Sequence, residues 1–147
     1  MKIIKYLLAN LMIWLALSAQ ADPSAGSAYK LERRQDSALM EVTSVQLKPH
    51  GGIINVVGDM GVYGKVYATY ELTAGADRSS GTVVGEGRGY MTNGDYASGS
   101  FTGAYNREGS IYTMHNIVII SDGTLNLDVI TFDALENSVR VDAYIIK

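Results

Sequence analysis

Three polar side chains that could bind a ligand occupy alternate positions past the middle of the chain: Glu86, Arg88 and Tyr90. Residues at i, i+2 and i+4 of a β-strand share one face. Inside a barrel, this cluster could bind a carboxylate or carbonyl group of a ligand. On the outer face it would be a solvated ladder, which the glycines, Val83 and Met91 of the opposite face favour. We keep the three as candidate ligand-binding residues.

His115 is the fourth candidate, within an expected strand that also places Ile111, Ile117 and Ile119 on the same face. A histidine that titrates near neutrality can act as an acid or a base. It has no Cys, Ser or second His at motif spacing, so a hydrogen-bonded structural histidine is the alternative. The sequence identifies no catalytic residue.

The alternating residues Asp122, Thr124, Asn126 and Asp128 are similar to part of a calcium loop. The glycine and the terminal glutamate that such a loop requires are missing at the necessary spacing. Asp122-Gly123 is better explained as a hairpin turn. We therefore predict no metal site and no cofactor.

The glycines of the central segment determine the expected architecture, because those at 81, 85, 87, 89, 99 and 103 all have odd numbers. Asn93-Gly94 separates two strands at 81–91 and 98–106 as a hairpin turn. Glycine within a strand marks a bend or a close approach of another backbone. A glycine stripe on both strands predicts a strongly coiled sheet that closes into a small barrel.

The remaining strands follow at regular spacing, with turn residues such as Gly58-Asp59 and Glu108-Gly109 between them. No amphipathic helix of useful length interrupts this pattern, which is typical of an antiparallel meander. The fold class is thus all-β, a small antiparallel meander β-barrel of about eight strands. The expected strands are 39–47, 52–57, 62–72, 81–91, 98–106, 110–120, 124–133 and 138–146.

The strand at 110–120 is apolar on both faces, with Ile111, Ile117 and Ile119 opposite Met114, Val118 and Ile120. A small barrel buries only one face of each strand. The other face requires cover from the N-terminal arm or from a second subunit, and we expect a homo-oligomer, a dimer or a trimer.

The first 21 residues have the features of a signal peptide. Lys2 and Lys5 precede an apolar run from Tyr6 to Leu17, and Ala19-Gln20-Ala21 supplies a cleavage motif. We predict cleavage after Ala21 and export to the periplasm or the extracellular space. The expected domains are a signal peptide at 1–21, a flexible arm at 22–37 and the barrel at 38–147.

Cleavage would leave ten basic residues against 15 acidic ones, a net charge of −5. This mild acidity argues against nucleic acid as a partner. The apolar run is shorter than the roughly 20 residues that span a bilayer, so no stable membrane insertion is expected after cleavage. The chain has no cysteine, and its stability must come from its core and its backbone hydrogen bonds.

The run Gly81-Thr82-Val83-Val84-Gly85-Glu86-Gly87-Arg88-Gly89, followed by Gly99-Ser100-Phe101-Thr102-Gly103, resembles the allene oxide cyclase-like barrel group. That group includes plant allene oxide cyclases, dirigent proteins and bacterial domains of unknown function. The resemblance implies an eight-stranded barrel, an apolar cavity in some members and frequent oligomers. No catalytic residue carries over.

Three functions follow from these observations. The first is binding of a small apolar molecule in or on an exported barrel. The second is a cofactor-free cyclase or isomerase that steers a reactive lipid or phenolic intermediate inside the barrel. The third is a structural or assembly protein with a filled core. A cavity would distinguish the first two from the third.

Overall fold

The computed structural model describes residues 29–147. The predicted signal peptide, 1–21, and residues 22–28 of the predicted arm lie outside this range. One turn of 3-10 helix, η1 (Gly61–Tyr63), accompanies nine strands: β1 (Leu31–Arg33), β2 (Ala38–Lys48), β3 (Gly51–Asp59), β4 (Lys65–Ala74), β5 (Ser80–Tyr90), β6 (Tyr96–Glu108), β7 (Ile111–Ile120), β8 (Leu125–Asp133) and β9 (Ser138–Ile146). Within the described range, no helix is long and apolar enough to cross a bilayer.

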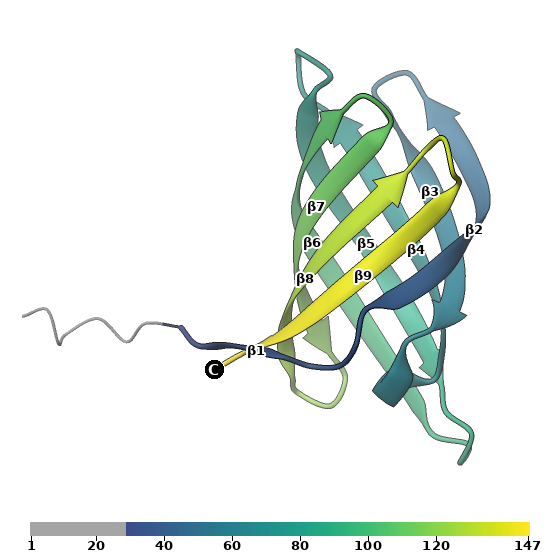
Figure 1. Ribbon diagram of the computed structural model, residues 1–147, viewed down its shortest axis with the longest axis vertical. Helices are drawn as coiled ribbons and strands as arrows, with labels where there is room; N and C mark the ends of the chain where they lie inside the picture. The colour runs from purple at the N-terminus through teal and green to yellow at the C-terminus, as the bar shows by residue number, and fades with distance from the viewer. Residues whose placement is uncertain (1–28) are drawn as a thin grey trace, which may run out of the picture.

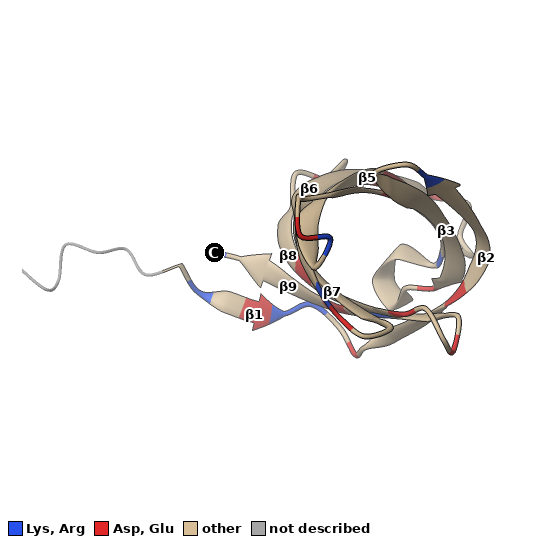
Figure 2. Cartoon of the chain, turned by 90° about the horizontal axis from the view of Figure 1, so that it is seen from above, with Lys and Arg blue, Asp and Glu red and all other residues tan. Residues whose placement is uncertain are grey.

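Strands β2 to β9 form a closed antiparallel barrel in meander order (Figure 1). Each strand pairs with its neighbours in sequence, and β9 closes the ring by pairing with β2 (Figure 2). The predicted all-β barrel is therefore confirmed. The predicted strand at 62–72 begins later, at Lys65, because η1 occupies Gly61–Tyr63.

Side chains alternate between the interior and the solvent along each strand. Val83, Met114 and Ile130 are among the most deeply buried residues of the core. In β7, Met114 and Val118 face inward together with Ile120, whereas Ile117 and Ile119 face outward and are 40% and 62% exposed. The doubly apolar strand thus leaves its isoleucine face on the outside of the barrel.

The glycine stripe lies on the inner face of β5 and β6, where at Gly81, Gly85, Gly89 and Gly103 other groups occupy the space that a Cβ would need. A Cβ on Gly85 would lie 1.9 Å from the Thr69 carbonyl oxygen and 2.5 Å from Cζ of Phe101, its cross-strand partner. A Cβ on Gly103 would lie 2.0 Å from the His115 carbonyl oxygen. Glycine at these two positions permits the tight coiling that the sequence predicts.

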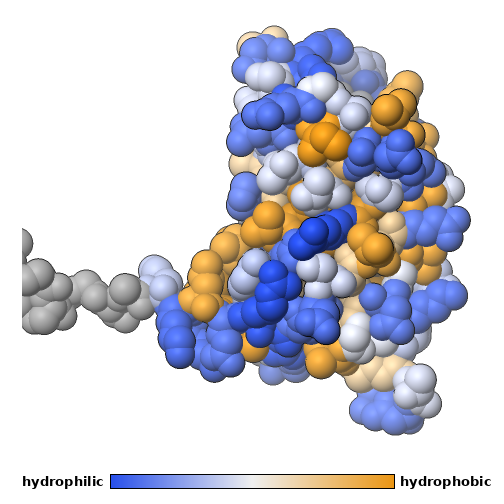
Figure 3. Space-filling view, in the orientation of Figure 1, coloured by the Kyte–Doolittle hydropathy of each residue, from blue (hydrophilic) through white to orange (hydrophobic). Residues whose placement is uncertain are grey.

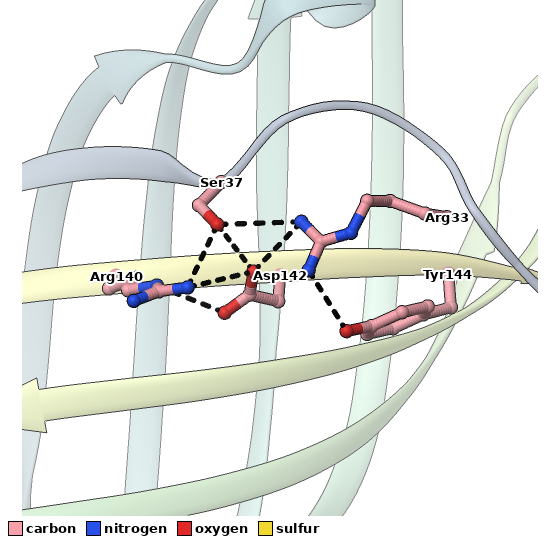
Figure 4. Close-up of polar contacts among 5 residues, drawn as sticks. All are labelled: Arg33, Ser37, Arg140, Asp142 and Tyr144. Carbon is pink, nitrogen blue, oxygen red and sulfur yellow. Dashed lines mark hydrogen bonds and ion pairs between the residues drawn. The ribbon is translucent and has the colours of Figure 1, made fainter.

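Part of the predicted N-terminal arm pairs with the barrel, because β1 continues along the edge of β9 beyond the end of β2. A polar cluster fastens it there (Figure 4). Asp142 accepts hydrogen bonds from Arg33 Nη1 at 3.1 Å, Arg140 Nε at 3.1 Å and Ser37 Oγ at 2.5 Å, and Arg33 also donates to the Tyr144 hydroxyl. We call these five residues the clasp. Around it, the surface mixes hydrophobic and hydrophilic residues (Figure 3).

Candidate ligand-binding site

The described barrel encloses a hollow towards each of its ends. One hollow, which we call the mouth, lies at the end with the β2–β3, β4–β5, β6–β7 and β8–β9 turns, uppermost in Figure 1. The other, which we call the chamber, lies towards the end that carries η1. Along β7 and β8, Met114 and Ile130 come between the lining residues of the two hollows and are each 1% exposed. Packed side chains therefore separate the mouth from the chamber.

The mouth has a volume of about 400 Å³ and a mostly apolar lining. A bulge in β2 between Val42 and Ser44 changes the alternation there. As a result, Val45 lies opposite the inward-facing Ile54 on β3. The apolar and aromatic lining residues are Val45, Leu47, Ile54, Leu72, Ala74, Tyr105, Tyr112 and Phe132.

An aromatic row lies across this lining. The ring of Tyr112 is 5.7 Å from that of Tyr105 and 5.5 Å from that of Phe132, centroid to centroid. Such tilted contacts are favourable for aromatic rings and fix their positions. The mouth thus has a rigid aromatic wall.

Three basic residues complete the lining: Lys48, Arg78 and Arg107. Lys48 forms an ion pair with Glu71. Arg78 and Arg107 form no ion pair with any residue of 29–147, and hydrogen bonds to backbone carbonyls hold them instead. The mouth therefore combines an apolar wall with two positive charges that no carboxylate balances.

The chamber is smaller, about 70 Å³, and contains the buried polar residues of the barrel. Asn126 and Asp128 line it, and Asn116 is the cross-strand partner of Asp128. Asn116 and Asn126 are 0% and 1% exposed. Both polar side-chain atoms of Asn116, Oδ1 of Asn126 and Oδ1 of Asp128 are buried without a hydrogen-bond partner in the described chain. Unpartnered groups of this kind are costly and are rare in folded proteins.

Asp128 is an ionisable residue of this region whose acidity is strongly changed. Burial raises the pKa of its carboxyl to about 7, because a charged carboxylate is poorly solvated there. Burial, together with the charge of Asp128, also raises the pKa of Tyr70, which lines the same chamber. Asp128 can consequently exchange a proton near neutral pH.

Tyr63, on η1, separates the chamber from a shallow outer hollow and lines both. Its hydroxyl accepts a 3.4 Å hydrogen bond from Nδ2 of Asn126, and the guanidinium of Arg34 lies 5.1 Å from its ring centre. Arg34 also pairs with Asp122 at 3.5 Å. These contacts hold Tyr63 in place between the chamber and the outer hollow.

The four residues that the sequence suggests for ligand binding lie on the outer faces of β5 and β7. Glu86, Arg88 and Tyr90 form an outer ladder on β5, in which Arg88 Nη2 donates a 2.7 Å hydrogen bond to Glu86. His115 is exposed on the outer face of β7. The structure brings the first three together on the surface and leaves His115 apart. Glu86, Tyr90 and His115 line neither hollow, whereas Arg88 is among the lining residues of the chamber, between Gly87 and Gly89.

The calcium-like pattern contains Asn126 and Asp128, whose place inside the barrel was not predicted from the sequence. The Asp122 carboxylate accepts a 2.8 Å hydrogen bond from the Thr124 amide in the β7–β8 turn, whereas Asn126 and Asp128 face the interior. Their alternation places Asn126 and Asp128 on one face of the strand, but it does not show that this face is the inner one. No three His, Asp or Glu side chains within 29–147 are grouped so as to hold a metal ion.

Comparisons with protein-family models, with curated proteins and with solved structures find no match for this chain. The chemistry of the two hollows is therefore judged from their own residues.

Proposed function

We propose that the protein binds a small molecule with a largely apolar body in the mouth of its barrel. Barrel mouths are common binding sites, and small-molecule pockets usually have volumes of roughly 300–1,000 Å³. The mouth, at about 400 Å³, falls in this range. The chamber, at about 70 Å³, does not.

The observation that supports this proposal best is the exposure of apolar side chains that line the mouth. Val45 and Leu47 are 48% and 85% exposed, although both line a hollow of the barrel. Burying such surface is favourable by about 25 cal/mol per Å². A ligand with an apolar body would provide that burial.

Binding of a fluorescent probe tests the proposal. N-phenyl-1-naphthylamine is neutral and brightens in apolar surroundings. Leu47→Ser should weaken its binding roughly threefold to tenfold. Leu39→Ser is the matched control, because Leu39 lies on the outer face of the same strand and is 74% exposed. Equal affinities of the two variants and the parent protein would rule out the mouth as the site.

We also propose that the protein acts after export. The support is the charged start, the short apolar run and the motif Ala19-Gln20-Ala21. Mass spectrometry of the mature form should find Asp22 at the N-terminus. A mature form that still begins at Met1 would contradict export by this route.

A second candidate function is a cofactor-free cyclase or isomerase of the allene oxide cyclase-like type, and Asp128 is the observation that favours it. A carboxyl with a pKa of about 7 can give or take a proton inside the barrel. Asp128→Asn should abolish turnover of a reactive lipid or phenolic intermediate. His115→Asn, on the outer face, should leave it unchanged. Full turnover by Asp128→Asn would exclude this chemistry.

The outer faces of β7 and β8 support the expected homo-oligomer. Ile117 and Leu127 are cross-strand partners there, as are Ile119 and Leu125. Ile119 and Leu125 are 62% and 39% exposed. We propose a dimer or a trimer packed through this patch. Light scattering at micromolar concentration tests it, with Ile119→Lys expected to give a monomer.

A further inference from the structure

The basic rim of the mouth adds a charge requirement to the ligand. We infer that the mouth selects a molecule with a carboxylate on its apolar body, and that Arg78 and Arg107 hold this carboxylate. The inference rests on the proposed function of the mouth. It follows from the charges, the positions and the free donors of the two arginines.

The charges at the mouth are one-sided. Its lining includes three basic residues and no acidic one. The charge of Lys48 is offset by its partner Glu71. The carboxylate of Asp77 lies in the same turn as Arg78, but it accepts its hydrogen bonds from the amide and hydroxyl of Ser79 and forms no ion pair with either arginine within residues 29–147. The two guanidinium groups therefore outnumber this one nearby carboxylate, and their charge can attract an anion that arrives from solvent.

The positions of the two guanidinium groups are fixed by the protein. Arg107 donates from Nε to the Arg78 carbonyl at 3.2 Å and from Nη1 to the Gly109 carbonyl at 2.9 Å. Arg78 donates from Nη2 to the Pro49 carbonyl at 3.2 Å. The hydrogen bonds link three turns at this end of the barrel. A site ordered before binding loses less entropy when the ligand arrives.

Each arginine keeps donors for a ligand. A guanidinium has five N–H groups, so the contacts above leave three on Arg107 and four on Arg78. Paired N–H groups of this kind match the two oxygens of a carboxylate. The adjacent aromatic wall of Tyr105, Tyr112 and Phe132 provides contact for the apolar body. The complement of this arrangement is an amphipathic acid.

The backbone at Arg78 provides a variant that tests the charge without threatening the fold. Arg78 has φ 56, in the left-handed region that favours glycine. Arg78→Gly removes the guanidinium and relieves this conformation at the same time. Loss of ligand selectivity in that variant would therefore not reflect misfolding. Arg88→Met is the matched control, because Arg88 lies on the outer ladder and its charge is paired with Glu86.

The experiment compares decanoate with decanol as competitors of N-phenyl-1-naphthylamine at pH 8 and low ionic strength. The parent protein and Arg88→Met should bind decanoate on the order of fivefold more tightly than decanol, because exposed ion pairs contribute modestly. This preference should decrease in Arg78→Gly alone and disappear in Arg78→Gly combined with Arg107→Met, and it should decrease in 0.5 M salt.

The possible outcomes separate this inference from the proposed function. Equal binding of decanoate and decanol by the parent protein would overturn the carboxylate preference and leave the apolar site standing. Tighter binding of decylamine than of decanoate would also overturn it. Failure of the neutral probe and of both competitors to bind would instead refute the mouth as a binding site.

Discussion

At the mouth, apolar side chains are exposed to solvent, and Arg78 and Arg107 form no ion pair with a carboxylate of residues 29–147. At the chamber, polar side chains are buried without hydrogen-bond partners among the same residues. Both ends depart from the usual arrangement of an apolar interior and a polar surface. At the mouth, a molecule that binds from solvent can cover the exposed apolar side chains and pair with the arginines. At the chamber, the cost falls on the folded state, because Asn116 and Asp128 have left water.

This difference indicates what to look for at each end. Substitutions at the mouth should change ligand affinity and leave the stability of the fold nearly unchanged. Substitutions at the chamber should change stability and its dependence on pH.

Gly103→Val should destabilise the protein by more than about 3 kcal/mol, through overpacking against backbone. A Cβ there would lie 2.4 Å from Oδ1 of Asn116, so the glycine provides the space for this buried amide. Gly87→Ala is the contrasting variant, since the atom nearest to a Cβ at Gly87 is 3.6 Å away. Its free energy of unfolding in urea should change by less than about 1 kcal/mol. Similar losses in the two variants would show that every glycine of the stripe is crowded.

Asp128→Asn should stabilise the protein by about 2–4 kcal/mol at pH 8 and have little effect near pH 4. The folded pKa of Asp128, about 7, exceeds the unfolded value of about 3.9. The folded state therefore keeps its proton longer, and the parent protein loses stability as pH rises from about 4 to about 7.

Urea unfolding at pH 4, 6 and 8 measures this effect as the difference between the two proteins. Subtracting one free energy of unfolding from the other removes the contributions of the other carboxylates, because both proteins share them. An outer-face control, Glu86→Gln, should show no comparable gain at pH 8, because Glu86 is solvated. A difference that does not vary with pH would mean that Asp128 is not desolvated.

Val45→Ser should change the free energy of unfolding by less than about 1 kcal/mol and still weaken binding of the neutral probe. The reason is that Val45 is 48% exposed and loses little apolar contact with the protein. Val56→Ser is the control on the neighbouring strand, where the side chain is 1% exposed. That variant should cost about 2 kcal/mol or more. If both variants lose equal stability, the wall of the mouth belongs to the core.

Asp142→Asn should lower the stability by only about 1 kcal/mol at neutral pH and should act locally, by loosening the clasp. The hydrogen bond from Ser37, with contributions from Arg140 and Arg33, lowers the pKa of Asp142. Its contribution is therefore present above an unfolded pKa of about 3.9 and is lost as pH falls below it.

Hydrogen exchange is the suitable measurement for this variant, because β1 should open locally rather than with the whole barrel. The amide of Arg34 donates to the Ala143 carbonyl at 2.8 Å and reports on this edge. Faster exchange there, with unchanged exchange in β5, is the expected result. Uniformly faster exchange would show that the clasp stabilises the entire barrel.

The barrel could be predicted from the sequence because its signals are local. Turn residues at regular spacing mark the strand ends, and the odd-numbered glycines fix which face of β5 and β6 lies inside. The bulge in β2 and the turn η1 were not predicted, because they depend on how β2 pairs with β3 and on how the barrel end is covered.

The polar chamber could not be predicted, because the inward face of β8 is chosen by its neighbours. Leu125, Leu127 and Val129 lie on the outer face of β8, and Asn126 and Asp128 lie on the inner one. By hydrophobic pattern alone, this half of the strand would point the other way. Ile130 and Phe132, further along the strand, set the orientation and carry the polar pair inside. On β5 the reverse holds. The glycines of this strand face the interior, and the polar candidates Glu86, Arg88 and Tyr90 therefore lie on the outer face.

Closure of the ring by β2 and β9 has a consequence for the order of folding. Seven of the nine pairings within residues 29–147 join strands that are neighbours in the chain, but Ala38–Glu41 pairs with Ser138–Val141, and β1 with β9, across about a hundred residues. Hairpins between neighbouring strands can form early, since their loops are short. The ring can close only after the last strand has been made. We expect the contacts of this seam to have low φ-values in folding kinetics, with β5 and β6 structured first.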